Sequence, residues 1–370
     1  MEPAAGMVRP EVLKLSPYNS GLTIAEVVER YAPERISKLG SNESPLGPSP
    51  KVAKALEGSS ERARLYPDPA SRRLRDALAT RFGVVPGQVM VGNGSEELLS
   101  IIARAVLRPG DRVVTLYPSF PLHEDYAVLM GANVDRVPVR EDLMVDVDAL
   151  VAAVSRPCRL VIFSNPMNPV GSWLGEDELA RVLAAADRDT LIVVDEAYAE
   201  YASGAGYPSA TELLRRSESS WIVLRTFSKG YGLAGLRIGY GIFGNAALCT
   251  LMDRVRTPFN VNAFAQDAAV AALGDDAHLA QVVRLAISER GRVERFLRQA
   301  GFQVAASKGN FLFFSCGGNS VAFAEDLLRQ GVIIKPWKQP GFENFGRVSI
   351  GSVAENSHFM QAVEANSRRR

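Results

Sequence analysis

Lys229 is the residue whose surroundings most directly suggest chemistry. It follows Ser228, precedes the turn Gly230-Tyr231-Gly232 and lies eight positions before Arg237. A neutral lysine amine can attack a carbonyl group and form a Schiff base, whereas a hydroxyl and a guanidinium can bind a phosphate. The spacing therefore favours an amine that holds a carbonyl cofactor, beside groups that hold the cofactor's phosphate. A surface lysine after a strand is the alternative interpretation.

Asp195 and Tyr198 lie where another apolar strand is expected to end. Asp195 closes the run Leu191–Val194, and a carboxylate there is costly to bury unless it meets a cation. The pyridinium nitrogen of pyridoxal phosphate is such a cation, and its protonation lets the cofactor ring accept electrons. Tyr198 could hydrogen-bond the phenolic oxygen of that cofactor. In the alternative interpretation, Asp195 caps the following helix.

Two further loops follow expected strands. Asn168 lies in Asn165–Gly171, a loop made rigid by two Asn-Pro pairs, and its amide could donate to the same phenolic oxygen. Phe120 could stack on a planar ring, and His123 could support Asp195 from behind. In the alternative interpretations, Asn165–Gly171 is a plain turn, Phe120 is a core aromatic ring and His123 is a structural histidine.

Anion-binding groups occur at two more places. The turn Gly92-Asn93-Gly94 precedes a helix expected from Ser95, and glycines there leave the first N–H groups, including that of Glu96, free to hold a phosphate. The acidic side chains could instead simply complement the helix dipole. Arg347, at the start of a late strand, could bind a carboxylate through two hydrogen bonds, or could be an exposed strand residue.

The elements that must position these residues alternate between short apolar runs and amphipathic helical stretches from about residue 52. This alternation predicts an α/β fold, with a mostly parallel seven-stranded sheet between helices and functional loops at the carboxyl ends of the strands. The expected strands are Gln88–Val91, Arg112–Leu116, Asn133–Pro138, Leu160–Phe163, Leu191–Val194, Trp221–Leu224 and Ile238–Phe243. The expected helices include Ser95–Leu107, Pro121–Met130, Val147–Ser155, Glu176–Ala186 and Ala246–Arg256.

Three parts are expected along the chain. Residues 1–50 form an N-terminal arm rich in Pro, Ser and Gly, residues 51–265 a large cofactor-binding domain, and residues 266–370 a smaller α+β C-terminal domain. The arm contains one expected helix, at Thr23–Tyr31. The C-terminal elements are a helical stretch over Gln266–Ala300, strands at Phe311–Ser315, Val332–Lys335 and Arg347–Ile350, and a helix from Glu355.

Composition limits the partners. The 370 residues carry a formal net charge of +1, which gives no general attraction to nucleic acid or to an anionic membrane. Cys158, Cys249 and Cys316 lack the spacing of a metal site or a disulfide, which fits a reducing compartment. No signal-peptide pattern and no bilayer-length apolar run occurs. We expect a cytoplasmic protein that binds small molecules, without metal, nucleic acid or membrane.

Five stretches together resemble the aspartate-aminotransferase superfamily of pyridoxal-phosphate enzymes (fold type I) and, within it, the histidinol-phosphate aminotransferase family. They are Ser41–Pro50, Tyr66–Pro69, Gly92–Glu97, Val194–Tyr198 and Arg225–Tyr240, and the similarity runs from about Leu15 to the end of the chain. The resemblance implies a ping-pong aminotransferase that converts histidinol phosphate and 2-oxoglutarate to imidazole-acetol phosphate and glutamate, and the reverse. Aromatic amino-acid transamination and threonine-phosphate decarboxylation are the alternatives. A non-enzymatic regulator is disfavoured, because residues 1–50 contain no helix-turn-helix pattern and no basic cluster.

The resemblance also implies roles for individual residues. Lys229 would form the Schiff base and move the substrate proton, and Asp195 would pair with the ring nitrogen. The other cofactor ligands would be Asn168 and Tyr198 at the phenolic oxygen, Phe120 on the ring, and Gly94, Ser95, Glu96, Thr226, Ser228 and Arg237 at the phosphate. The substrate ligands would be Tyr18, Asn168, Lys335 and Arg347, with Arg347 on the α-carboxylate. In the homodimer that the family forms, Tyr66 would reach the phosphate of the partner subunit's cofactor, and Tyr18 the partner's substrate.

The chain departs from the family pattern at several positions. The family often has an arginine twelve residues before the carboxylate-binding one, where this chain has Lys335. A lysine can hold a phosphate as a point charge but lacks the bidentate fork of an arginine. The nearby Trp337 could favour a substrate that carries a ring. Val170, Ser44 and His123 replace a threonine, an asparagine and a tyrosine that are common in the family.

Overall fold

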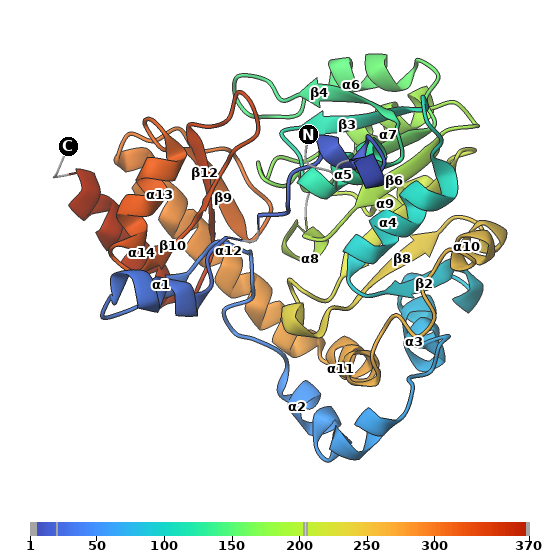
Figure 1. The fold of residues 1–370 in the computed structure, drawn as a ribbon, viewed down its shortest axis with the longest axis horizontal. Coiled ribbons are helices and arrows are strands. Elements are labelled where there is room, and N and C mark those ends of the chain that lie inside the picture. The colour runs from blue at the N-terminus through green and yellow to red at the C-terminus, as the bar shows by residue number, and fades with distance from the viewer. Residues whose placement is uncertain (1–5, 20, 203, 205, 368–370) are drawn as a thin grey trace.

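The computed structural model describes residues 6–19, 21–202, 204 and 206–367, so the outer ends of the expected arm and C-terminal domain, 1–5 and 368–370, lie outside it. A seven-stranded sheet forms its centre (Figure 1). In spatial order its strands are β2 (Val89–Gly92), β8 (Gly239–Phe243), β7 (Ser220–Thr226), β6 (Leu191–Asp195), β5 (Leu160–Ser164), β3 (Arg112–Tyr117) and β4 (Asn133–Pro138). β8 runs antiparallel to the other six strands of this sheet. This confirms the predicted α/β class.

Helices cover both faces of this sheet, because successive strand residues point to opposite sides. In β5, Val161 and Phe163 pack into one hydrophobic cluster, whereas Leu160 and Ile162 pack into another. The first cluster includes residues of α2 (Pro50–Leu56), α3 (Arg72–Phe82), α6 (Val147–Val154), α7 (Glu176–Ala185), α9 (Ala210–Leu214) and α11 (Ala263–Leu273). The second includes residues of α4 (Ser95–Val106), α5 (Pro121–Leu129) and α10 (Ala246–Asp253).

A smaller antiparallel sheet lies in the C-terminal part of the chain. Its strands, in spatial order, are β11 (Lys335–Pro336), β12 (Phe345–Ser349) and β9 (Phe311–Ser315), and its helices are α12 (Asp276–Gln299), α13 (Ser320–Leu328) and α14 (Val353–Ser367). Part of the N-terminal segment joins this unit: β1 (Ser37–Lys38) pairs with β10 (Val332–Ile333), and α1 (Ile24–Tyr31) lies beside it (Figure 1). Division of the chain at residues 50 and 265 stays a prediction.

Two C-terminal elements differ from the sequence prediction. The helical stretch expected over Gln266–Ala300 is interrupted, because α11 ends before Gly274 and the Asp275 side chain caps α12 by accepting the N–H of His278. The single strand expected over Val332–Lys335 is split between two sheets. Its first half pairs with β1, whereas its last residue pairs with β12.

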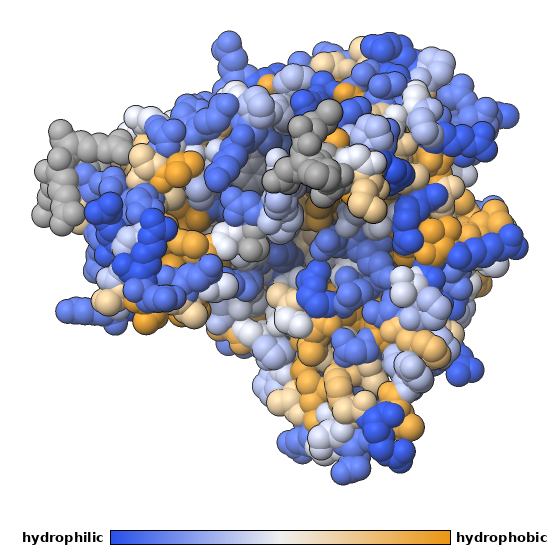
Figure 2. Space-filling view, in the orientation of Figure 1, coloured by the Kyte–Doolittle hydropathy of each residue, from blue (hydrophilic) through white to orange (hydrophobic). Residues whose placement is uncertain are grey.

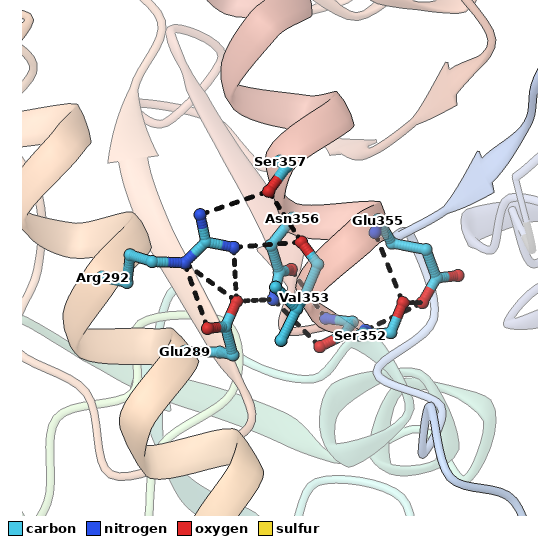
Figure 3. A network of polar contacts seen from close by, with 8 residues as sticks. Glu289, Arg292, Ser352, Val353, Glu355, Asn356 and Ser357 are labelled. Carbon is cyan, nitrogen blue, oxygen red and sulfur yellow. Dashed lines mark hydrogen bonds and ion pairs between the residues drawn. The ribbon is translucent and has the colours of Figure 1, made fainter.

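A buried polar network joins α12 to the start of α14 (Figure 3). Asn356 Nδ2 donates to Glu289 Oε2 at 2.9 Å, and Arg292 Nη2 donates to the same oxygen at 2.6 Å. Asn356 also binds both main-chain groups of Gly351, each at 2.9 Å. Burial raises the pKa of Glu289, but the hydrogen bonds from Arg292 and Asn356 outweigh it, so the pKa lies below its usual value. The network thus anchors the chain immediately after β12.

We expect Asn356→Ala to lower the free energy of unfolding by about 1–3 kcal/mol, because it leaves buried N–H and C=O groups of Gly351 without partners. Urea denaturation would measure the change. Ser357→Ala, at the partly exposed edge of the same network, serves as the control and should change stability by no more than about 0.5 kcal/mol. Equal losses in the two variants would contradict the importance of the Asn356 contacts.

Candidate functional site

A cavity of about 380 Å³ lies at the carboxyl ends of β5, β6 and β7, beside β11 and β12. Parallel strands bring their carboxyl ends to one edge of the sheet, so loops that are distant in sequence meet there. Every predicted site residue except Tyr66 lies in its wall. These residues are Tyr18, Gly94, Ser95, Glu96, Phe120, Asn168, Asp195, Tyr198, Thr226, Ser228, Lys229, Arg237, Lys335 and Arg347. Their individual roles stay predictions.

The Lys229 amine lies just beyond β7 and donates to the main-chain oxygen of Ser41 at 2.8 Å. Removal from water, together with the positive charges of Arg347 and Arg237, lowers the pKa of Lys229 to about 7. Near neutral pH, roughly half of these amines would therefore carry no charge. The uncharged form is the one that attacks a carbonyl group.

Asp195 is the last residue of β6, and its carboxylate is buried. Its Oδ2 lies 3.1 Å from Nε2 of His123, and its Oδ1 accepts the N–H of Ala197 at 3.0 Å. His123 comes from α5 and is itself buried, and its Nδ1 has no hydrogen-bond partner among the described residues. These contacts hold a carboxylate at the cavity wall, as binding of a protonated ring nitrogen requires.

Contacts outside the cavity also stabilise the ends of β6 and β7. Glu196, the residue after Asp195, is fully buried and pairs with Arg225 Nη2 at 2.6 Å. It also accepts the N–H of Ala210 at 3.1 Å, and it lies 3.3 Å from the hydroxyl of Tyr207, which donates to the main-chain oxygen of Asn165. This ion pair connects the end of β6 to β7 without entering the cavity that Asp195 lines.

The N-terminus of α4 and the Arg237 guanidinium form one side of the cavity. No described side chain caps α4, so the N–H groups of its first turn remain available to an anion. A Cβ on Gly94 would lie 2.8 Å from Arg237 Nη2, so a glycine leaves room for the guanidinium. Arg237 adopts a left-handed conformation at φ +53° and lies 3.5 Å from the Glu96 carboxylate.

Thr226 and Ser228 add hydroxyl groups to this side. Thr226 Oγ1 donates to Ser228 Oγ at 3.0 Å and accepts the N–H of Ser228 at 3.1 Å. The Ser228 hydroxyl proton is therefore free to be donated to an anion in the cavity. Together with Arg237 and the N-terminus of α4, these hydroxyls form a site that suits a phosphate group.

Arg347, in β12, lies at the other side of the cavity and is buried. Its Nη1 donates to Asn168 Oδ1 at 2.6 Å and its Nη2 to the oxygen of Gly40 at 2.8 Å, whereas its Nε has no partner among the described residues. A buried guanidinium with unused donors is suited to a carboxylate or phosphate ligand. Because Asn168 Oδ1 is already engaged, its amide nitrogen is the group left to face a cofactor.

Lys335 lies directly opposite Arg347 in the β11–β12 pairing. Its amine donates to the main-chain oxygen of Asn19, and burial together with the positive charges of Arg347 and Lys338 lowers the pKa of Lys335 to about 8. Like charges placed opposite each other on neighbouring strands repel. An anionic ligand between them would relieve this repulsion.

Tyr18 and Tyr66 lie in different surroundings. Tyr18 lines the cavity of its own chain, and its expected contact with the substrate of the partner subunit stays a prediction. Tyr66 lies outside the cavity: it is 82% exposed, and its ring stacks on that of Phe259 with the centroids 4.5 Å apart. Tyr66 therefore makes no contribution to the cavity of its own chain.

The sequence prediction assigned no role to the segment Gly40–Asn42, which forms part of the site. Gly40 and Ser41 offer main-chain oxygens to Arg347 and Lys229, and the Asn42 side chain donates to Tyr198 Oη at 3.0 Å. Main-chain contacts of this kind leave no signature in side-chain types. The available signal was the stretch Ser41–Pro50, one of those that carried the family resemblance.

The cavity fits the predicted cofactor, pyridoxal phosphate, on several observations. The Lys229 amine, with a pKa of about 7, suits a carbonyl group, and buried Asp195 suits a protonated ring nitrogen. The phosphate site formed by α4, Thr226, Ser228 and Arg237 suits the phosphate. Tyr198 and the Asn168 amide could both donate to the phenolic oxygen.

Comparison with known proteins gives consistent matches along the whole chain. The family model described as "Aminotransferase class I and II" matches residues 34–363. Histidinol-phosphate aminotransferase 1 of Mesorhizobium japonicum is 63% identical over 363 residues, which cover 98% of this chain and 99% of that protein. Histidinol-phosphate aminotransferase 3 of Rhizobium meliloti is 57% identical over 357 residues, 96% of each chain. The crystal structure of histidinol-phosphate aminotransferase from Sinorhizobium meliloti in complex with pyridoxal-5'-phosphate has a TM-score of 0.86 at 29% identity, covering 97% and 98% of the two chains.

The low pKa of Lys229 can be tested on protein freed of cofactor. Acetic anhydride modifies only neutral amines, so labelling of Lys229 should rise with pH through a midpoint near 7, whereas an ordinary lysine has a pKa of about 10.4. Peptide mass spectrometry would follow the labelling, with exposed Lys54 as an internal reference. Arg347→Met should move the Lys229 midpoint upward by about one unit, because it removes a neighbouring positive charge. A wild-type midpoint near that of Lys54 would contradict the assignment.

Proposed function

The chain belongs to the class I and II aminotransferases, as its sequence predicted, and we propose that it transfers an amino group between histidinol phosphate and 2-oxoglutarate. The products are imidazole-acetol phosphate and glutamate, a reaction of histidine biosynthesis. The observation that carries this choice of substrate is the pair of cations Lys335 and Arg347, which face each other in the cavity that contains Lys229. The names and identities of the two relatives support it.

Enzymes of this family use pyridoxal phosphate, which when bound supplies a ring that withdraws electrons from the Cα of the substrate. Lys229 moves the proton at that Cα, since a pKa of about 7 lets its amine both accept and release a proton near neutral pH. Asp195 keeps the ring nitrogen protonated, and His123 keeps Asp195 in place. Tyr198 and Asn168 orient the ring through its phenolic oxygen.

Both substrates use the same cationic side of the cavity. Glutamate presents its α-carboxylate to Arg347, whose Nε and remaining Nη hydrogens are available to it. Histidinol phosphate has no carboxylate, so its phosphate lies between Arg347 and Lys335 in the other half-reaction. Tyr18 lines the same cavity, which supports a contact between its side chain and the substrate.

Transamination of aromatic amino acids is the second candidate function. The ring of Trp337 is buried, and its centroid lies 5.9 Å from the guanidinium carbon of Arg347. Trp337 belongs to the hydrophobic core behind the cavity wall, so it could influence an aromatic substrate through its contact with Arg347. The kcat/KM values for histidinol phosphate, phenylalanine and tyrosine, each with 2-oxoglutarate as acceptor, would separate the two candidates.

A homodimer completes the proposed site. The Tyr66–Phe259 pair is itself exposed, with Phe259 at 41%, and Leu65, the neighbour of Tyr66 in sequence, is 56% exposed. Figure 2 shows apolar side chains gathered over the part of the surface formed by α2 and α11. Burial of such a surface favours association with a second copy, which would carry Tyr66 of the partner subunit to the phosphate of the cofactor.

Within the described residues no helix is both long enough and apolar enough to cross a bilayer, and a cytoplasmic location stays a prediction.

Lys229→Ala should reduce amine transfer from histidinol phosphate to 2-oxoglutarate by about a thousandfold or more, because the group that moves the Cα proton is lost. Glutamate formation would be the measurement. Lys338→Ala, which removes an exposed amine near the cavity, should leave the rate within about twofold. A Lys229→Ala enzyme that retained a tenth of the wild-type rate would contradict the mechanism.

Lys335→Met should lower kcat/KM for histidinol phosphate by about 10- to 100-fold, because a charge-assisted contact to phosphate is lost. The kcat/KM for glutamate should change by no more than about threefold. Because the pKa of Lys335 is about 8, its charge is lost as the pH rises above 8, so the wild-type KM for histidinol phosphate should increase there. Lys335→Arg, which keeps its charge, should show no such increase. Equal losses for the two substrates in Lys335→Met would contradict the assignment.

A further inference from the structure

Three consecutive residues hold three different functional side chains. The oxygen of Gly40 accepts from Arg347, the oxygen of Ser41 accepts from Lys229, and the side chain of Asn42 donates to Tyr198. The first two contacts use the main chain, so almost any residue could make them. The third requires the side-chain amide of Asn42.

Asn42 is fully buried and adopts a left-handed conformation at φ +55°. Its N–H donates to Ser349 Oγ at 2.7 Å, and its Oδ1 lies 2.9 Å from the same hydroxyl. Its main-chain oxygen accepts from Asn310 Nδ2 at 3.1 Å. A non-glycine residue holds such a backbone conformation only when its surroundings enforce it, and these hydrogen bonds do so.

The same contacts determine which end of the Asn42 amide faces Tyr198. The Asn42 N–H can only donate, so Ser349 Oγ must accept it. The single proton of the Ser349 hydroxyl then has Asn42 Oδ1 as its acceptor. The amide NH₂ is consequently the end that faces the phenol, and Tyr198 Oη accepts from it. A flipped amide would leave the Ser349 proton without an acceptor.

With one lone pair of Oη engaged, the Tyr198 hydroxyl proton is free to be donated into the cavity. The charged groups near this ring are Arg347 on β12, Asp195 at the end of β6 and Lys229 after β7, whose Nζ lies 5.9 Å from the ring centroid, and the titratable Tyr18 of the N-terminal segment also interacts with it. Among the described residues, Asn42 is the only one whose side chain hydrogen-bonds Oη. No neighbouring carboxylate therefore competes for the phenol proton.

We propose that Asn42 is a positioning residue that acts through Tyr198: its amide keeps the phenol a hydrogen-bond donor toward the cofactor's phenolic oxygen, in an orientation set by Ser349. The inference rests on the proposed placement of the cofactor against Tyr198. It also connects the two parts of the molecule, because Ser349 and Arg347 lie two residues apart on one face of β12. The strand that binds the substrate anion thus also orients the tyrosine that contacts the cofactor.

The test is a pH titration of the absorbance of the bound cofactor in holoenzyme without substrate. A donor at the phenolic oxygen stabilises its ionised form, so Tyr198→Phe should raise the pH midpoint by about one unit. Asn42→Asp has nearly the same shape, but its carboxylate accepts the phenol proton and withdraws it from the cavity. We expect Asn42→Asp to raise the midpoint by a similar amount.

The double variant that combines Asn42→Asp with Tyr198→Phe decides whether Asn42 acts through Tyr198. The shift caused by Asn42→Asp should fall by at least half when Tyr198 is already Phe, and a shift that falls by less overturns the proposal. If Asn42→Asp does not fold or bind cofactor, the same criterion applies to Ser349→Ala, which frees the amide to flip and should shift the midpoint in the same direction. If Tyr198→Phe leaves the midpoint unchanged, Tyr198 does not contact the cofactor's phenolic oxygen, and the role proposed for Asn42 falls with that contact. This outcome differs from one in which Tyr198→Phe shifts the midpoint but Asn42→Asp acts independently of Tyr198, so the two failures are distinguishable.

Discussion

Each basic side chain of the cavity is held by a main-chain carbonyl oxygen, although three carboxylates, Glu43, Glu96 and Asp195, also line the wall. The pairs are Lys229 with Ser41, Arg347 with Gly40, Lys335 with Asn19 and Arg237 with Ala234. A carbonyl dipole directs a cation without neutralising it, so most of the positive potential stays available for the phosphate and carboxylate groups that the site is proposed to bind. The Glu96 carboxylate approaches Arg237 only at 3.5 Å. Removal from water, helped by the charge of Arg347, lowers the pKa of the Lys229 amine to about 7 and keeps it partly uncharged.

Much of the fold could be predicted because burial on both faces leaves a clear pattern. The runs Leu160–Phe163 and Leu191–Val194 are apolar at every position, and both are central strands whose alternate residues enter opposite clusters. The site was predictable for a related reason. Asn168, Asp195 and Lys229 each follow such a strand, and parallel strands bring their carboxyl ends together.

The features that could not be predicted depend on contacts between distant segments. The turn from α11 to α12 at Gly274 and the division of Val332–Lys335 between two sheets are determined by which elements pack nearby. The contribution of Gly40–Asn42 was missed for two reasons: two of its contacts use the main chain, and the third joins residues 156 positions apart.

Asp195 and Glu196 are adjacent in sequence, yet one lines the cavity and the other forms an ion pair behind it. The strand end is therefore supported by a bond that takes no part in ligand recognition. Substrate recognition and the support of the strand ends therefore rest on different side chains. A substitution in the cavity wall can change which ligand binds without removing the Glu196–Arg225 ion pair that joins β6 to β7.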